Sequence, residues 1–558
     1  MTGTNEQPWL SMYPAGLAAQ IPVPHGSLVE AWLARVAKNP DGVAVRYFDH
    51  ALTAVEVDRA SDALAAALEA RGTKAGDHVG VYLQNIPQYA LTLLALWKLG
   101  AAALVLNPMY RKQELRRLVD DAGAVGIVCA DTDVDETRRT LAGSTVGWMV
   151  STSPLDFQAR NDSRIFSDTD RLAPASDGDL LTVVREYDGR GPSTAPAVTV
   201  GPDTVALLAY TSGTTGPAKG AMCTHANVLN VAITYGAWTG LEDGDVVLAL
   251  APLFHITGAV VNAAIALIHD TTLVFANRFH PEVTLEAFVE QGVTTTIGSI
   301  TAFNALYEVP HAGPEHFESV KSLYSGGAPI PPATVDRFEK RFGVYIHNGY
   351  GMTETTSAVI AVPPGVRAPV HKESGTLSIG IPLPNMAARV VDPNGNPVPF
   401  GVQGELELTG QQVIPGYWNQ PEATEQTLPR GRLRTGDGAI IDERGWVYLV
   451  DRLKDQINSS GYKVWPREVE DVLYEHPAVH EAAVVGQPDD YRGERVVAYV
   501  SLRAGATVTP DELIGFARDR LAAYKAPRDV HLIDDLPKTQ TGKIRRRVLR
   551  DAALNRAG

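Results

Sequence analysis

The feature that most constrains this chain is a glycine- and hydroxyl-rich stretch at residues 211–220, Thr-Ser-Gly-Thr-Thr-Gly-Pro-Ala-Lys-Gly. It directly follows the apolar run 205–210, which predicts a buried strand, so the stretch is expected to form a loop at a strand end. Glycines allow tight turns around a ligand, and hydroxyls and backbone amides donate hydrogen bonds to anionic oxygens. The stretch therefore predicts a phosphate-binding loop, with these contributing residues: Thr211, Ser212, Gly213, Thr214, Thr215 and Lys219.

This loop differs from the Walker A motif, which ends in Gly-Lys followed by Ser or Thr so that a hydroxyl reaches magnesium. Here the end is Ala218-Lys219-Gly220. A plain surface turn would explain the composition of the stretch but not the order of its ten residues. The stretch resembles the signature loop of the adenylate-forming superfamily, which comprises acyl-CoA synthetases, luciferases and the adenylation domains of peptide synthetases.

Length and composition limit the classes of protein to be considered. At 558 residues the chain is too long for one ordinary domain, and its net charge of −15 argues against nucleic-acid binding. The N-terminus lacks the features of a secretory signal, and polar residues interrupt the longest apolar runs, so we expect a cytoplasmic protein without a membrane span. Cys129 and Cys223 lie far apart in apolar surroundings, which excludes a disulfide framework and predicts two small buried residues.

The periodicity of apolar residues predicts alternating helices and strands from about residue 27. Helices are expected at 28–37, 54–71, 87–99 and 112–121, and strands at 43–47, 79–83, 102–106 and 125–129. Residues 151–203 lose this periodicity and are expected to form a long surface connection. After the loop, a helix from Thr224 and strands at 246–250, 272–275 and 294–297 predict a second layer of similar build.

Dense turns and short strands at 375–449 predict an antiparallel β segment, and a small α+β unit is expected from about residue 455. The expected fold class is therefore α/β. Its large N-terminal domain would have two mainly parallel α/β subdomains and a β-rich subdomain, followed by a small mobile α+β domain. The resemblance implies boundaries at 1–450, 451–454 for the hinge, and 455–558.

Five further segments match the same superfamily in its order, so the resemblance covers about residues 25–550. They lie at 252–255, at 325–330 with 348–355, at 433–437, at 451–470 and at 537–547. In the first, the residue at His255 is implied to lie beside the acyl pocket. A histidine at a strand end is also often only packed or hydrogen-bonded, so both readings of His255 stay open.

The second and third segments predict a nucleotide site. Glycines at 326 and 327 would let a flat base lie against the backbone, and Tyr350 offers an aromatic face for adenine. Core packing is the alternative role of Tyr350, but its position between two glycines argues against it, because glycines leave space rather than fill it. Thr353 can donate to the α-phosphate, and Glu354 is a hard oxygen ligand suited to Mg²⁺. By resemblance, the site also includes Ala328, Gly351, Asp437, which would hold the ribose hydroxyls, and Arg452.

The last two segments are implied to act in alternation. Lys454 corresponds to the hinge, Gly461 and Tyr462 to the loop that lines the pantetheine channel, and Lys543 to the adenylation lysine. A lysine in a basic run is usually only a solvated charge, and here the Thr-Gly-Lys-Ile context favours the catalytic reading. The neighbouring arginines would flank Lys543, or with Lys525 would meet the phosphates of CoA.

The resemblance implies an AMP-forming acyl-CoA ligase that uses ATP, Mg²⁺ and coenzyme A. The segments implied to line the acid pocket, 224–235, 297–302 and 355–359, are small and apolar, which predicts a roomy pocket for a medium- or long-chain fatty acid or a bulky alicyclic or terpenoid acid. Four alternatives stay open: an aryl-CoA ligase, a luciferase-like oxygenase, a non-catalytic nucleotide sensor, and a member that only thioesterifies a preformed adenylate. Arg432, where many relatives have Trp, is the one hint of the last. An acyl carrier protein as acceptor and a homodimer are also left open.

Overall fold

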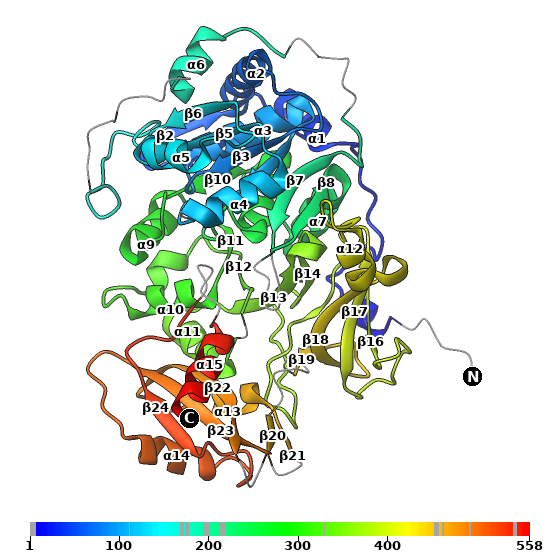
Figure 1. The fold of residues 1–558 in the computed structure, drawn as a ribbon, viewed down its shortest axis with the longest axis vertical. Helices are drawn as coiled ribbons and strands as arrows, with labels where there is room; N and C mark the ends of the chain where they lie inside the picture. The colour runs from blue at the N-terminus through cyan, green and yellow to red at the C-terminus, as the bar shows by residue number, and fades with distance from the viewer. Residues whose placement is uncertain are drawn as a thin grey trace.

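The computed structural model describes residues 7–110, 112–167, 172, 178–192, 200–211, 218–328, 330–450, 457–459, 462–489, 493–538 and 544–557 (Figure 1). Three sheets form the N-terminal part of the chain, and a fourth sheet forms a smaller C-terminal unit. The predicted fold class is therefore confirmed. Short 3₁₀ helices occur at Pro8–Met12, Asp131–Asp133, Pro314–Phe317, Thr353–Thr355 and Pro429–Gly431.

The first sheet has six strands in the order β6-β5-β3-β4-β7-β8. All its neighbours are parallel except β7 and β8, which form an antiparallel pair. Its strands are β3 (His78–Tyr82), β4 (Ala102–Val105), β5 (Gly126–Ala130), β6 (Trp148–Thr152), β7 (Val205–Tyr210) and β8 (Gly220–Thr224). The helices of this part of the chain are α1 (Leu28–Lys38), α2 (Ala54–Ala70), α3 (Pro87–Leu99), α4 (Lys112–Ala122), α5 (Val134–Leu141) and α6 (Leu180–Glu186).

The second sheet has nine strands in the order β15-β14-β13-β12-β11-β9-β10-β1-β2, and it is parallel from β13 to β1. These strands are β1 (Val43–Tyr47), β2 (His50–Thr53), β9 (Val246–Leu248), β10 (Thr272–Phe275), β11 (Thr295–Gly298), β12 (Ser322–Ser325), β13 (Ile346–Met352), β14 (Ser357–Ala361) and β15 (Ile381–Pro382). Its helices are α7 (His225–Thr239), a π-helix (Gly258–Ala264), α8 (Ile265–Ile268), α9 (Pro281–Glu290), α10 (Ile300–Glu308) and α11 (Pro332–Phe342).

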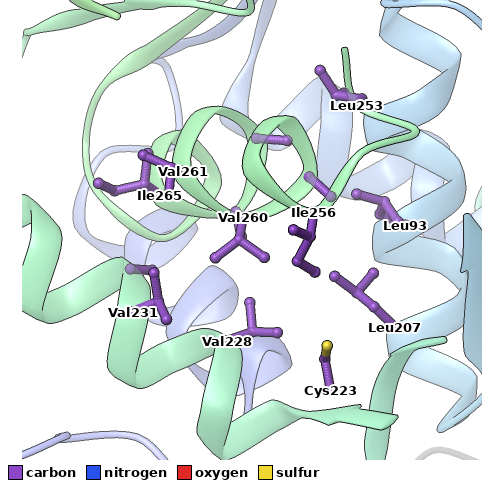
Figure 2. Packing of buried hydrophobic residues seen from close by; sticks show 14 of the residues in the cluster. Leu93, Leu207, Cys223, Val228, Val231, Leu253, Ile256, Val260, Val261 and Ile265 are labelled. Atoms are coloured by element: carbon purple, nitrogen blue, oxygen red, sulfur yellow. The ribbon is translucent and has the colours of Figure 1, made fainter. Parts of the chain in front are cut away.

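The core lies between these two sheets. Helix α3 contacts β3 and β4 of the first sheet and β1 of the second, and all its residues except Lys98 are buried. The Lys98 ammonium binds Asp58 and Asp62 of α2, at 2.7 and 2.6 Å, which neutralises the single charge of the helix. Figure 2 shows a second part of this core, where Val228 of α7 faces Ile256 and Val260.

The third sheet is antiparallel, as predicted, and contains β16 (Met386–Val391), β17 (Gly404–Gly410), β18 (Leu433–Ile441) and β19 (Val447–Leu449), with α12 (Pro421–Thr427) beside it. In the described residues of the C-terminal unit there are five strands and three helices, and the unit lies next to α11 (Figure 1). They are β20 (Ile457–Ser459), β21 (Tyr462–Val464), β22 (Val479–Asp489), β23 (Gly493–Leu502), β24 (Asp529–Leu532), α13 (Pro466–Tyr474), α14 (Pro510–Arg518) and α15 (Arg546–Ala557).

Two expectations need correction. The segment 151–203 is not a plain surface connection, because it contains α6, whose Leu180 and Val183 are buried. Residues 220–224 were not predicted as a strand, yet they pair with β7, so the phosphate loop connects two antiparallel strands before α7 begins. The burial of both cysteines is confirmed, and burial raises the pKa of each thiol to about 12.

Candidate active site

The candidate site lies at the carboxyl ends of β11, β12 and β13. These strands are parallel, and their register places Gly298 beside Ser325 and Ser325 beside Asn348. The Gly326 amide donates to the Gly298 carbonyl at 3.3 Å, which continues this edge by one residue. Ligands of open α/β sheets bind at such an edge, because the loops that leave the strands converge there.

Glycines are required at this edge by close backbone packing. A Cβ on Gly326 would lie 2.8 Å from the Gly349 carbonyl oxygen, and one on Gly351 would lie 1.8 Å from that of Ser357. Gly327 has a φ of +79°, which most side chains disfavour. Ala328, which follows, is half-buried. The edge therefore presents bare backbone to a ligand, as expected for a surface against which a flat base packs.

Tyr350 and Asp437 are brought together from different sheets. The Tyr350 hydroxyl, at the end of β13, donates to Asp437 Oδ2 of β18 at 2.7 Å. Burial raises the pKa of Tyr350 well above its ordinary value, and the nearby carboxylates of Asp437 and Glu354 raise it further. Tyr350 therefore stays protonated and remains a donor to Asp437 at neutral pH.

Glu354 is held by a residue that the sequence did not single out. Its carboxylate is only 7% exposed and accepts a hydrogen bond of 2.6 Å from the Tyr417 hydroxyl. The Lys219 ammonium lies 4.8 Å from the centre of the Tyr417 ring, within the range of a cation–π contact. A continuous series of contacts thus joins Lys219 of the predicted phosphate loop to Glu354 through Tyr417.

The position of Tyr417 follows from strand pairing. Tyr417 forms an antiparallel β-bridge with Ala221 of β8. On one side of this bridge the Met222 amide donates to the Gly416 carbonyl at 3.1 Å, and on the other the Trp418 amide donates to the Gly220 carbonyl at 2.7 Å. Since Lys219 immediately precedes β8, this pairing places Tyr417 beside it. Burial, and then the Glu354 charge, raise the pKa of the Tyr417 hydroxyl above its ordinary value, so it remains a donor.

The backbone just after Glu354 is strained. Thr356 has a φ of +55° and Ser357 has a φ of +112°, values that residues other than glycine rarely adopt. The strained turn is held by hydrogen bonds from Thr355 Oγ1 to the Ser357 carbonyl at 2.7 Å and from Thr356 Oγ1 to the Gln412 carbonyl at 2.9 Å. Such strain often occurs at functional sites, where the surrounding structure fixes it. This strained turn directly follows the short helix that carries Thr353 and Glu354.

His255 follows β9 and is half-buried just before the π-helix. Its amide donates to the Pro252 carbonyl at 3.0 Å, and a Cβ on Gly258 would lie 2.1 Å from the oxygen of that carbonyl. This tight turn packs Ile256 against α7, as Figure 2 shows. Both readings of His255, in packing and in substrate binding, stay open.

Several predicted site residues lie outside the described part of the chain. They are Ser212, Gly213, Thr214 and Thr215 of the phosphate loop, and Arg452, Lys454, Gly461 and Lys543. Of Tyr462, only the backbone is described, in β21. The roles of these residues stay predictions. Thr211 is described, and its amide donates to the Lys219 carbonyl at 2.9 Å, which joins the two ends of the loop.

Arg432 has a partner in the third sheet. Its Nη1 lies 3.6 Å from Oε1 of Glu407, a buried carboxylate that also binds Arg389 Nε at 2.6 Å. The residue at 432 is therefore an exposed charge balanced by an acid of β17. The hypothesis that Arg432 marks a member that only thioesterifies a preformed adenylate stays a prediction.

Comparison with known proteins assigns the family. Residues 32–418 match the model of an AMP-binding enzyme, and residues 468–543 match the model of the AMP-binding enzyme C-terminal domain. The chain belongs to the AMP-binding enzyme family. The predicted resemblance to adenylate-forming enzymes of the acyl-CoA synthetase type is confirmed at the level of this family.

Three relatives of this AMP-binding enzyme are informative. A long-chain-fatty-acid–CoA ligase of Bacillus subtilis (strain 168) is 33% identical over 99% of both chains. A feruloyl-CoA synthase of Amycolatopsis is 34% identical over 92% of this chain and 96% of the relative. The solved structure of o-succinylbenzoate CoA synthetase from Bacillus subtilis, in complex with its acyl-adenylate intermediate, has a TM-score of 0.79 at 27% identity and covers 94% of this chain and 98% of its own.

The donor set of the AMP-binding enzyme fits a nucleotide with magnesium. Among the residues that the structure describes, no group of three His, Cys, Asp or Glu side chains could hold a metal ion. A single carboxylate such as Glu354 is nevertheless sufficient for Mg²⁺, which is commonly bound by one or two carboxylates together with the phosphates of the substrate. Within the same described ranges, no helix is long and apolar enough to cross a membrane.

The C-terminal unit contacts the edge that carries the site. Arg467 of α13 is buried and donates to the Ile330 carbonyl at 2.6 Å, four residues after Gly326. On the same side, Arg503 forms an ion pair with Glu308 at the end of α10. Neither Arg467 nor Tyr417 was predicted from the sequence, because each gains its role only through a distant partner.

Proposed function

We propose that this protein is an AMP-forming acyl-CoA ligase that activates a hydrophobic carboxylic acid as an acyl-adenylate and then transfers the acyl group to CoA. The observation that carries this proposal is the linkage of Lys219 to Glu354 through Tyr417 and the hydrogen bond from Tyr350 to Asp437, with the Glu354 charge close enough to raise the pKa of Tyr350. Tyr350 also packs against the apolar cluster that contains α7. Full-length similarity to a fatty-acid–CoA ligase supports the same reaction.

In the first step, an oxygen of the acid attacks the α-phosphorus of ATP, and the bond from that phosphorus to pyrophosphate breaks. Asp437 would accept hydrogen bonds from the ribose hydroxyls, and the glycine edge at 326–327 would support the base. Glu354 would hold Mg²⁺, which offsets phosphate charge when bound. Lys219 and Lys543 would meet the negative charge of the phosphates, and loss of such a contact commonly lowers a rate roughly 10²- to 10³-fold.

In the second step, the CoA thiolate attacks the acyl carbon of the adenylate, and AMP leaves. The acyl-adenylate found in the o-succinylbenzoate relative supports this order of steps. The proposed hinge at Lys454 would allow the C-terminal unit to exchange Lys543 for the Gly461 loop between the two steps. The contacts of Arg467 and Arg503 with the N-terminal part would break and reform in this exchange.

The acid would lie between α7 and the π-helix. In this layer Val228, Val231, Ile256 and Val260 are all at most 3% exposed (Figure 2). Apolar walls of this kind favour a medium- or long-chain fatty acid or a bulky alicyclic or terpenoid acid over a small polar one. The side chains pack closely, so the tail would enter as they move apart.

The test is product analysis by mass spectrometry with a panel of fatty, terpenoid and aromatic acids, each offered with MgATP, with and without CoA. The proposal expects acyl-CoA and AMP with CoA, and acyl-AMP without it. Acyl-CoA from a supplied adenylate, but never from the free acid, would instead support the half-reaction alternative. Light emission or oxygen uptake would support a luciferase-like reaction.

A second candidate is an aryl-CoA ligase, and the feruloyl-CoA synthase relative favours it specifically. The two candidates share every step and differ only in the acid. The same panel separates them through the ratio of kcat/KM for an aromatic acid to that for a fatty acid. An acyl carrier protein can replace CoA in the panel, which tests the alternative acceptor.

A further inference from the structure

A small cavity lies behind the site, between the last turns of α7 and strand β11. Tyr235 and Thr239 of α7, Val261 and Ile265 at the π-helix and α8, and Ile297 of β11 line it. The cavity has room for about one water molecule. Val261 and Ile265 can be located in Figure 2, at the far end of the apolar layer from Cys223.

This cavity lies close to the glycine edge. Ile297 lines the cavity, and its Cδ1 lies 4.0 Å from the point where a Cβ on Gly326 would stand. Strand β11 runs from Thr295, which also lines the cavity, to Gly298 at the edge, a span of about 10 Å at the rise of a parallel strand. The acyl chain of a substrate that starts at the reacting carboxylate and follows β11 inward would therefore end at the cavity.

The Tyr235 hydroxyl is the unusual group in the cavity wall. Tyr235 is 4% exposed, and its hydroxyl has no hydrogen-bond partner among the residues that the structure describes. Burial raises the pKa of this hydroxyl well above its ordinary value, so it keeps its proton. A buried hydroxyl without a partner is unfavourable, and native structures rarely keep one without a reason.

The other hydroxyls of the cavity wall are satisfied within the protein. Thr239 Oγ1 donates to the Tyr235 carbonyl at 3.0 Å, and Thr296 Oγ1 donates to the Leu248 carbonyl at 2.7 Å. Thr295 Oγ1 and Ser322 Oγ lie 2.9 Å apart and share a hydrogen bond. Tyr235 is therefore the hydroxyl of this wall that is available to a ligand.

We propose that Tyr235 is a specificity-determining residue that hydrogen-bonds an oxygen on the distal part of the acyl substrate, so that the preferred acid carries a hydroxyl or carbonyl group on its apolar tail. This inference rests on the proposed acyl-CoA ligase function. A tyrosine hydroxyl both donates and accepts, so it suits either kind of oxygen. The apolar residues around it would contact the rest of the tail.

The test compares acids in pairs. Medium-chain ω-hydroxy acids of increasing length are each matched with the unsubstituted acid of equal length, and kcat/KM for acyl-CoA formation is measured with wild-type protein and with Tyr235→Phe. Wild-type protein should prefer the hydroxy acid about 10- to 100-fold at one chain length, because the plain acid leaves the hydroxyl unpaired. Tyr235→Phe should lose this preference, because its ring offers no partner to the oxygen of the hydroxy acid.

Tyr324→Phe is the matched control. Tyr324 packs edge-on against Tyr235, with ring centres 5.5 Å apart, but its hydroxyl already donates to the Val362 carbonyl at 3.0 Å. This variant should retain the preference. Absence of a preference in wild-type protein at every length, or an unchanged preference in Tyr235→Phe, would overturn the inference.

A second measurement does not depend on the choice of acids. Because the Tyr235 hydroxyl has no partner among the described residues, Tyr235→Phe should melt at or above the wild-type temperature, whereas Tyr324→Phe should melt below it. A clear fall in the melting temperature of Tyr235→Phe would show an internal partner and would overturn the inference. Failure of the ligase proposal can be told apart from failure of the Tyr235 inference, because in that case no acid of any kind would yield acyl-CoA.

Discussion

Replacing Tyr417 by Phe tests the series of side-chain contacts that joins Lys219 to Glu354. The change removes one hydroxyl, which donates at 2.6 Å to a carboxylate that is 7% exposed. A hydrogen bond to a charged group contributes about 1.5–3 kcal/mol, and its loss leaves a buried carboxylate oxygen without this donor. If that energy fixes Glu354 for the first step, the adenylation rate should fall about 10- to 100-fold.

The assay is pyrophosphate release with a good acid substrate, measured across a range of Mg²⁺ concentrations. Tyr417→Phe should also require more Mg²⁺ for half-maximal rate, because Glu354 is the proposed ligand. The control is Tyr448→Phe, which removes a comparable tyrosine–carboxylate hydrogen bond, 3.1 Å long, to Asp442 in the third sheet. A Tyr417→Phe rate within about twofold of wild type, or an equal loss in the control, would refute the reasoning.

Three further predictions address ribose binding, the proposed adenylation lysine and pH. Asp437→Ala should raise the KM for ATP about tenfold, because one charged hydrogen bond is lost, while the KM for the acid stays unchanged; steady-state kinetics with each substrate varied checks this, and an altered acid KM alone would contradict it. Lys543→Ala should lower adenylation roughly 10²- to 10³-fold but spare the conversion of supplied acyl-AMP to acyl-CoA, whereas a bulky residue at Gly461 should do the reverse; an equal fall in both half-reactions would reject the assigned roles. Burial lowers the pKa of His225 to about 3, so the unfolded chain takes up a proton at a higher pH than the folded protein does. The free energy of unfolding should therefore fall as pH drops from about 6.5 towards 3. Urea unfolding should show a smaller fall for His225→Gln, and an identical fall would exclude this histidine as a cause.

Local sequence signals predicted most of the fold. Helix α3 was placed at its observed bounds, because Pro87 suits a first helical position and Gly100 ends the helix with a φ of +67°. Strand β8 was missed, since it has only three apolar residues, Ala221, Met222 and Cys223, and directly precedes the helix that begins after Thr224. Its partner β7 lies across the phosphate loop, and only this pairing makes it a strand.

The sequence could nominate Glu354, Asp437 and the glycines at 326–327, because each is a residue type suited to one chemical role, and these roles stay predictions. Tyr417 and Arg467 were not predictable, because their partners lie 63 and 137 residues away in the sequence. The unpaired hydroxyl of Tyr235 could not be predicted either, since a tyrosine in an apolar helix predicts core packing. Only the structure shows that this hydroxyl has no partner among the described residues.

The central claim is that a free acid is activated by ATP through an adenylate and delivered to CoA. The most direct measurement is mass spectrometry of the nucleotide and acyl products formed by purified protein from MgATP, CoA and a hydrophobic acid. The account predicts equal amounts of AMP and acyl-CoA, with acyl-AMP when CoA is withheld. Formation of ADP, or of AMP without any acyl product across the whole panel of acids, would contradict it.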